Sequence, residues 1–269
     1  MKADFHTHTN FSTDAEKTST PENMILGAIE KGLDVICITD HMDKDYDEEG
    51  KEFVFHTEEY FRILKPLREK YKHRIDVRIG VELGLQPHLK DFAKEYVNQY
   101  PFDFVIGSVH VLHGRDPYYR EGFSDLTDEE LYRQMFEETL ENVKNISDFD
   151  VLGHLDYIVR YGFGQEKAYS YSRNVDIVDE ILKRLISEGK GIELNTAGLK
   201  YGLPFAHPHM DVLKRYKELG GEVITVGSDG HKPEHLAYDF HKVKDILEAC
   251  GFKYYTEFKE RKLIFKQVG

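Results

Sequence analysis

The stretch KADFHTHTNFSTDA, residues 2–15, begins with the pattern of a strand, ends as a polar loop, and carries His6, His8 and Asp14. Side chains two residues apart on a β-strand point to the same face, so His6 and His8 are expected to lie side by side. A single His-x-His pair is a weak motif. Its meaning depends on whether other strands of the chain end in similar side chains.

Six further apolar runs have the length and composition of strands, and they alternate with stretches in which apolar residues have helical spacing. These runs are DVICIT (34–39), DVRIGVEL (76–83), FDFVIGSVH (102–110), DVLGHL (150–155), GIELNT (191–196) and EVITVGSD (222–229). Several are almost continuously apolar and β-branched, as parallel strands buried on both faces should be. Helices are predicted at 21–31, 57–72, 88–99, 127–145, 173–188 and 209–219. Thr20 before Pro21 and the capping box TDEE (127–130) mark two of the helix starts.

This alternation predicts an α/β fold with parallel strand pairing and right-handed crossovers. Polar residues follow nearly every strand, whereas an open doubly wound sheet gathers them at one switch point. A seven-stranded (β/α) barrel is therefore expected, as a single domain over residues 1–269. The C-terminal stretch FKYYTEFKERKLIFKQVG (252–269) predicts a β-hairpin that turns at KERK and packs on the barrel.

Every predicted strand ends in a side chain that can bind a metal ion. In chain order these are His6 and His8, Asp40 and His41, Glu82, His110, His154 and Asp156, Glu193 and Asn195, and Asp229 and His231. The carboxyl ends of parallel strands meet at one rim of a barrel, so these side chains should converge there. Packing gives no reason for all seven strand ends to share this feature, which favours a metal site.

Nine residues are the predicted metal ligands: His6, His8, Asp14, His41, Glu82, His110, His154, Asp229 and His231. A zinc-like ion takes three or four protein ligands, so nine predict a cluster of two or three divalent ions. Imidazole and carboxylate without thiolate suit Zn, Mn, Fe or Co. Asp40 and Asp156 flank ligands and are expected to accept the spare ring N–H of a ligating histidine, and Asp4 and Glu193 are further candidates for that role.

Composition excludes several classes of protein. The 36 basic and 49 acidic residues give a net charge of −13, which argues against a general basic surface for nucleic acid or anionic membrane. No apolar run reaches the roughly 18 residues that span a bilayer, and MKADFHTHT lacks the apolar centre of a secretory signal. A cytoplasmic protein is expected. Cys37 and Cys250 imply no disulfide framework, and the oligomeric state stays open.

The succession of H-x-H, TDH, a lone glutamate, SVH, GHLD and GSDGH resembles the PHP (polymerase and histidinol phosphatase) family over residues 3–235. The resemblance implies a distorted (β/α)7 barrel with three metal positions. They would be formed by His6, His8, Glu82 and Asp229; by Glu82, His110 and His154; and by Asp14, His41 and His231, with Glu82 bridging the first two. Some relatives carry histidine where this chain has Asp14. The segments NFSTDA, DVLGHLDYIVRYG and ELNTAGLK are most similar to the histidinol-phosphate phosphatase branch.

That branch implies hydrolysis of L-histidinol phosphate to L-histidinol and phosphate in histidine biosynthesis, by attack of a metal-bridging hydroxide on phosphorus. Arg160 and Lys200 follow strand ends and are the expected phosphate clamp. His207, in FAHPHM, is expected to overhang the pocket, and with Asp40 these residues form the candidate catalytic set. In the long loop 111–125, VLHGRDPYYREGFSD, His113 and Tyr118 are the expected contacts to the organic part of the substrate.

Two other functions stay open. One is a PHP phosphoesterase for a different phosphate ester, including a nuclease, which the net acidity of the chain disfavours. The other is a non-catalytic PHP module that binds a polymerase, which the intact ligand set disfavours.

Overall fold

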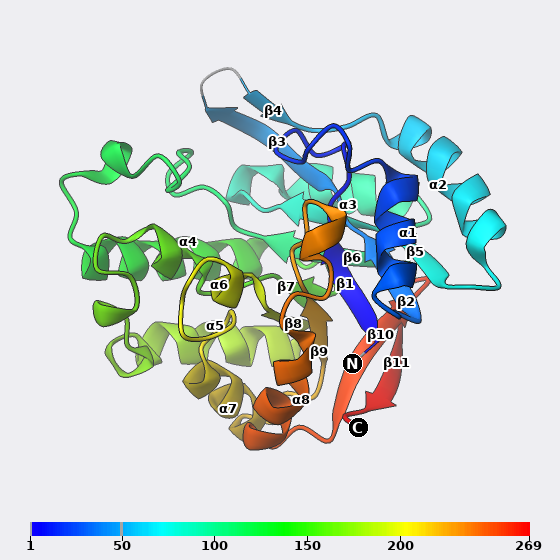
Figure 1. The fold of residues 1–269 in the computed structure, drawn as a ribbon. Helices are drawn as coiled ribbons and strands as arrows, with labels where there is room; N and C mark the ends of the chain where they lie inside the picture. Colours follow the sequence, from blue (N-terminus) through cyan, green and yellow to red (C-terminus); the bar gives the residue numbers. More distant parts are fainter. Residues whose placement is uncertain (1, 49–50) are drawn as a thin grey trace.

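Seven parallel strands form a barrel in the computed structural model, which describes residues 2–48 and 51–269 (Figure 1). In the order of their pairing they are β1 (Ala3–Thr7), β2 (Val35–Ile38), β5 (Asp76–Gly84), β6 (Phe104–Ser108), β7 (Val151–Leu152), β8 (Gly191–Asn195) and β9 (Ile224–Gly227). The barrel closes where β1 meets the end of β9, because His8 N donates to Gly230 O at 2.9 Å and Asp229 N donates to His6 O at 2.8 Å. The distorted (β/α)7 barrel expected from the sequence is confirmed.

Helices connect the strands and cover the outside of the barrel. The six predicted ones are α1 (Pro21–Glu30), α2 (Thr57–Tyr71), α3 (Lys90–Gln99), α4 (Asp128–Asn145), α5 (Val175–Ser187) and α7 (Met210–Glu218). The side chain of Thr20 caps α1 by accepting from Asn23 N, and Thr127 and Glu130 form the predicted capping box of α4. The unpredicted helices are α6 (Ala197–Lys200) and α8 (Phe240–Ala249). Short 3₁₀ helices occur at Pro87–Leu89, Arg120–Phe123, Tyr157–Tyr161, Gln165–Lys167, Tyr171–Arg173 and Pro233–His235. In the described part of the chain, no helix has both the length and the apolar character that crossing a membrane requires.

A hairpin that the sequence did not predict rises from the barrel rim. It consists of β3 (His41–Glu48) and β4 (Lys51–Phe53), seen at the top of Figure 1. The sequence of β3, HMDKDYDE, is rich in residues with low strand propensity, which explains why it was missed. Its first residues pair with β5, where His41 lies opposite Glu82 and Met42 opposite Leu83. This pairing continues the sheet beyond the barrel and places Asp43 beside the predicted ligands.

The C-terminal hairpin covers the opposite end of the barrel. It is formed by β10 (Tyr254–Lys259) and β11 (Lys262–Gln267), and it turns at Glu260 and Arg261, both with a left-handed backbone. The Phe258 ring packs against Phe104 with centroids 5.0 Å apart, and Arg261 N donates to Asp103 O. Asp103 precedes β6, so the hairpin lies at the amino ends of the strands. The prediction of a hairpin turning at KERK is confirmed.

Candidate metal centre

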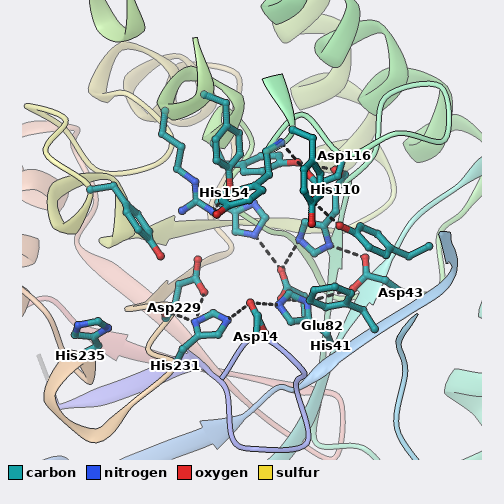
Figure 2. A pocket seen from close by; sticks show the side chains of 18 of the residues that line it. Asp14, His41, Asp43, Glu82, His110, Asp116, His154, Asp229, His231 and His235 are labelled. Atoms are coloured by element: carbon teal, nitrogen blue, oxygen red, sulfur yellow. Dashed lines mark hydrogen bonds and ion pairs between the residues drawn. The ribbon is translucent and has the colours of Figure 1, made fainter. Parts of the chain in front are cut away.

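The nine predicted ligands meet at the carboxyl ends of the strands. A pocket of about 460 Å³ opens there, and Figure 2 shows its lining. Seven of the nine line it: Asp14, His41, Glu82, His110, His154, Asp229 and His231. His6 and His8 are fully buried and lie within 3.5 Å of Glu82 or Asp229, behind that lining. Strands far apart in the sequence thus bring their ends together as the barrel pattern predicted.

Glu82 lies between two groups of imidazoles. Its Oε2 is 3.1 Å from His6 Nε2 and 3.4 Å from His8 Nε2. Its Oε1 is 3.1 Å from His110 Nε2 and 2.9 Å from His154 Nε2. Oε2 also lies 3.1 Å from His41 Nδ1. Because its two oxygens face different sets of rings, this carboxylate could be shared between two cation positions.

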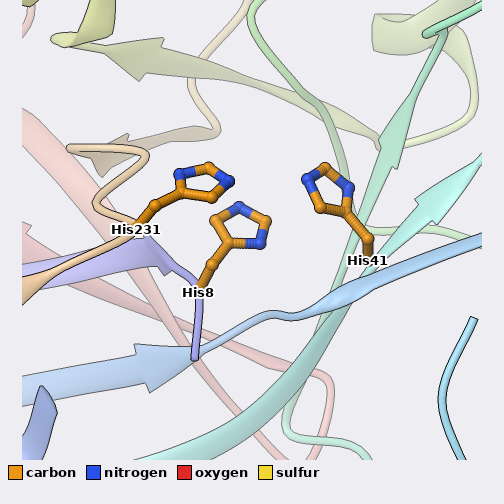
Figure 3. A group of neighbouring side chains, drawn as sticks. All are labelled: His8, His41 and His231. Carbon is orange, nitrogen blue, oxygen red and sulfur yellow. The ribbon is translucent and has the colours of Figure 1, made fainter. Parts of the chain in front are cut away.

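Two further carboxylates serve the remaining imidazoles. Asp229 Oδ1 is 3.5 Å from His8 Nε2, and Asp14 Oδ2 is 3.0 Å from His231 Nε2 and 3.8 Å from His41 Nε2. The His8 ring stacks against His231 at 4.0 Å and against His41 at 4.3 Å between centroids (Figure 3). The three groupings that the family resemblance implied are therefore spatially compact.

Several potential ligand atoms are buried without a hydrogen-bond partner in the described part of the chain. They are His6 Nε2, His8 Nε2, Glu82 Oε2 and His231 Nε2. An unsatisfied buried polar atom costs about 1–3 kcal/mol, and native proteins contain few of them. Here they gather in one cluster and face one another. This residue set therefore fits divalent cations, which would satisfy those atoms together.

The charges of the cluster shift its pKa values in opposite directions. Burial pushes the pKa of Glu82 up, but the imidazoles of His6, His41 and His110 outweigh it and hold the pKa well below its usual range. Burial pushes the pKa of His41 down, but Glu82 and Asp14 outweigh it and raise the pKa to about 9. Both shifts mean that carboxylates and imidazoles stabilise each other's charged forms in this cluster.

Glu193 orients one of the predicted ligands. Its Oε1 lies 2.7 Å from His6 Nδ1, and its Oε2 accepts from His154 N at 3.0 Å. An ionised carboxylate can only accept, so His6 Nδ1 carries the proton and Nε2 presents its lone pair to Glu82. Asp4 instead accepts from Ser228 and from Ala237 N, so it holds the loop after β9.

Asp40, Asp156 and His207 do not take the roles that the sequence predicted, and none of them lines the pocket. Asp40 accepts hydrogen bonds from the backbone and hydroxyl groups of Thr9 and Ser12, so it fixes the loop after β1 and contacts no ligating ring. Asp156 accepts from His207 Nδ1 at 2.7 Å and from His209 N at 2.8 Å. His207 is fully buried on that carboxylate and does not overhang the pocket. The expectations for these residues failed because flanking a ligand in sequence does not fix the direction of a side chain.

Of the four predicted substrate contacts, two line the pocket and two do not. Arg160 and Tyr118 line the pocket. Lys200 lies behind the lining and donates to the backbone oxygen of Asp229 at 2.7 Å. The side chain of His113 is 65% exposed and pairs with Glu138 on α4, outside the pocket. Lys200 and His113 are therefore not placed as substrate contacts.

Sequence reasoning missed several residues that line the pocket. The aromatic and acidic ones include Asp43, Asp116, Tyr157, Tyr161 and Tyr201. Tyr157 and Tyr161 belong to GHLDYIVRYG, where tyrosines four residues apart close after a ligand could have signalled a shared face. Asp43 follows the ligand His41 by two residues, but only the unpredicted β3 reveals that both point into the pocket.

Comparison with known proteins identifies the family. The PHP domain model matches residues 4–197, so the chain belongs to the PHP domain family. It is 33% identical over 264 residues to a histidinol-phosphatase of Lactococcus lactis, covering 97% of this chain and 96% of that protein. It is also 33% identical to a probable histidinol-phosphatase of Thermotoga maritima, covering 93% of each chain.

Solved structures agree with this family. The crystal structure of histidinol phosphate phosphatase from Lactococcus lactis, in complex with zinc, L-histidinol and phosphate, superposes with a TM-score of 0.88 at 32% identity, covering 98% of each chain. A putative histidinol phosphatase from Listeria monocytogenes, 22% identical, shares the fold with a TM-score of 0.77 and covers 90% of this chain and 99% of its own.

Proposed function

We propose that this chain is a metal-dependent phosphatase that hydrolyses L-histidinol phosphate to L-histidinol and phosphate in histidine biosynthesis. The observation that carries the proposal is Glu82, whose Oε1 faces two imidazoles and whose Oε2 faces three others, all at 2.9–3.4 Å. The full-length similarity to histidinol-phosphatases supports the choice of substrate. One closed sheet spans β1 to β9, which supports a single metallophosphoesterase domain over residues 1–269.

Two or three divalent ions would be held by the nine ligands, in the three groups described above. Zinc has support from the Lactococcus lactis complex, and the donor set also suits Mn, Fe or Co. Bound there, such ions supply Lewis acidity and lower the pKa of water toward 7, so that hydroxide is available at neutral pH. The chain's own contribution is to hold the ligand atoms in place, since Glu193 fixes the His6 ring and the barrel fixes the strand ends.

Arg160 is the best candidate for binding the phosphate group. It lies in the pocket lining, and its guanidinium stands over the rings of Tyr201, Tyr161 and Tyr157 at 4.4, 4.9 and 5.5 Å. One of its terminal nitrogens donates to Tyr161 Oη at 2.8 Å, while its Nε is buried without a partner. Held in this aromatic cage, the guanidinium keeps donors for a phosphate oxygen.

The outer part of the pocket suits the organic part of histidinol phosphate. Tyr118 and Tyr119 from the loop after β6 line it together with Asp116. Aromatic rings can pack against an imidazole ring, and a nearby carboxylate favours an ammonium group. A volume of about 460 Å³ is in the usual range for small-ligand sites.

The proposal is tested by metal removal and a substrate panel. The protein is stripped with a chelator and then reloaded with Zn²⁺, Mn²⁺, Fe²⁺ or Co²⁺ under anaerobic conditions. Phosphate release is then measured on histidinol phosphate and nucleoside monophosphates, and cleavage is measured on single-stranded DNA. We expect activity to vanish on stripping, to return with metal, and to favour histidinol phosphate. Preference for DNA would favour the nuclease alternative, and loaded protein that hydrolyses no phosphate ester would favour the non-catalytic module.

A further inference from the structure

A buried aspartate of the unpredicted hairpin contacts two of the proposed ligands at once. Asp43, on β3, is 6% exposed and lies deep in the pocket (Figure 2). Its Oδ1 is 2.6 Å from His110 Nδ1, and its Oδ2 is 3.2 Å from His41 Nδ1. His41 starts β3 and His110 follows β6, so one carboxylate joins side chains from two separate segments.

These contacts determine which ring nitrogen of each histidine is available to a cation. An ionised carboxylate has no proton to donate, so both Nδ1 atoms must carry the hydrogen. The lone pairs then lie on the Nε2 atoms. His110 Nε2 faces Glu82 Oε1 at 3.1 Å, and His41 Nε2 faces Asp14 Oδ2 at 3.8 Å. The two lone pairs thus point toward different carboxylates, in two different proposed metal groups.

The backbone of the neighbouring strand is shaped to admit this carboxylate. A Cβ atom built on Gly84, at the end of β5, would lie only 2.1 Å from Asp43 Oδ1 and 2.6 Å from its Cγ. Any other residue at position 84 would therefore displace the Asp43 side chain. Glycine is needed here for close approach, not for an unusual backbone angle.

We propose that Asp43 is a positioning residue that orients His41 and His110 together and so couples two cation positions of the cluster. His41, Asp43 and His110 are close enough together to hold a cation themselves, and Glu82 Oε2 lies 3.1 Å from the same His41 Nδ1. We assign Asp43 a positioning role because both of its oxygens face Nδ1 atoms, whereas the Nε2 atoms of the two rings face Glu82 and Asp14. The inference deepens the proposed function, since it rests on the same metal cluster. Its test measures metal binding and not turnover.

The test compares Asp43→Asn and Asp43→Ala with Asp45→Asn. Asp45 is a matched control: it lies on the same strand, and its Oδ2 is 3.1 Å from His88 Nε2, outside the pocket. Its left-handed backbone, with φ of 59°, also tolerates asparagine. Each protein is stripped and titrated with Zn²⁺ against a chromogenic chelator. Co²⁺ absorption spectra report the coordination, and thermal unfolding of the stripped proteins reports the fold.

We expect Asp43→Asn to weaken the binding of at least one Zn²⁺ ion by about 10-fold, and Asp43→Ala by about 100-fold, the range seen for carboxylates behind metal ligands. Asparagine keeps one acceptor and can satisfy only one of the two rings, so its effect is smaller. The Co²⁺ spectrum should change in both variants and stay unchanged in Asp45→Asn. Metal-free Asp43→Asn should unfold within about 3 °C of the unsubstituted chain, a shift of about 1 kcal/mol or less.

A double-mutant cycle sharpens the test. Gly84→Ala alone should weaken Zn²⁺ binding as Asp43→Asn does, because it displaces the carboxylate. In the Asp43→Ala background, Gly84→Ala should weaken Zn²⁺ binding by about threefold or less, since the carboxylate that it displaces is already absent. Wild-type Zn²⁺ affinity in Asp43→Asn, or an affinity loss matched by unfolding of the stripped protein, would overturn the inference. If the unsubstituted chain bound no Zn²⁺ or Co²⁺, the proposed function would fall as well.

Discussion

Buried carboxylates at the two ends of the barrel have different partners. At the amino ends of the strands, Asp103 pairs with Arg68, and Asp150 pairs with Arg261 at 2.5 Å. Backbone N–H groups also donate to these two carboxylates, from Ile79 and Val105. At the carboxyl ends, every ion-pair partner of Glu82 in the described part of the chain is a histidine.

This difference separates a structural end from a functional end. An arginine is permanently charged, so the chain itself neutralises Asp103 and Asp150. An imidazole can give up its proton and become a neutral ligand, so the carboxylates at the rim can exchange their imidazole partners for a cation. Removing a carboxylate should therefore reduce stability at one end and activity at the other.

The largest effect is expected for Glu82→Gln. Losing the shared carboxylate should reduce kcat/KM for histidinol phosphate by on the order of 10⁴-fold, since it would disturb two cation positions together. The stability of the metal-free variant should change far less than its activity, because His41 can lose its proton once the carboxylate that raises its pKa is gone. Steady-state kinetics, elemental analysis and denaturant unfolding of the stripped protein check this. Full metal content with normal turnover would contradict the bridging geometry.

At the amino ends of the strands, Asp103→Ala should instead reduce stability and leave activity nearly unchanged. The substitution removes the acceptor of Ile79 N and of the Arg68 guanidinium. We expect it to lower the free energy of unfolding by about 3 kcal/mol. This value is near the lower limit for buried ion pairs, because Arg68 is partly exposed. Turnover of the folded, metal-loaded protein should stay within about twofold. Asp34→Ala is the control, because its side chain lies before β2 at the same end but is 69% exposed and pairs with the 67% exposed Lys2, so it should cost under about 1 kcal/mol. Urea unfolding and kinetics measure both quantities.

Arg160→Ala tests the role of the arginine at the carboxyl ends of the strands. Its guanidinium contacts tyrosine rings, whereas Arg68 and Arg261 pair with carboxylates. We expect KM to rise by about 10–100-fold with a smaller change in kcat, since a charge-assisted hydrogen bond to phosphate contributes about 1.5–3 kcal/mol. Arg160→Lys should recover part of this loss, because it keeps the charge without the planar fork. Unchanged steady-state constants in Arg160→Ala would remove this residue from phosphate binding.

The smallest effect is expected for His113→Ala. Its side chain is mostly exposed and lies outside the pocket, so kcat/KM should stay within about twofold and stability within about 0.5 kcal/mol. Tyr118→Ala, in the same loop but in the pocket lining, is the matched comparison and should raise KM more. An equal effect of the two substitutions would mean that the loop changes its arrangement when substrate binds.

Local patterns predicted most of the elements, and the candidate ligands that they indicated lie together in the structure. Apolar runs placed the seven barrel strands, because strands buried on both faces need continuous apolar sequence. The metal-binding side chains follow those strands directly, so strand prediction also located them. Helix α8 was missed although Phe240, Val243 and Leu247 have helical spacing, and α6 is too short to give a periodic signal.

Side-chain direction was the part that sequence did not predict. Asp40 and Asp156 lie next to candidate ligands in the sequence, yet Asp40 holds a loop and Asp156 holds His207. Lys200 follows β8 as predicted but donates to the backbone of Asp229. Such partners depend on loop paths, for which local sequence has no periodic pattern.

The sequence by itself determined the alternation of strands and helices, the closed seven-stranded barrel and the identity of the nine candidate ligands, because these depend on local periodicity and on the shared direction of parallel strands. Only the tertiary structure decided that Glu82 also approaches His41, that Asp43 joins His41 to His110, and that Arg160 is held among tyrosines. Those contacts join side chains brought together by strand pairing and loop packing, and the distances between them are set by the whole fold.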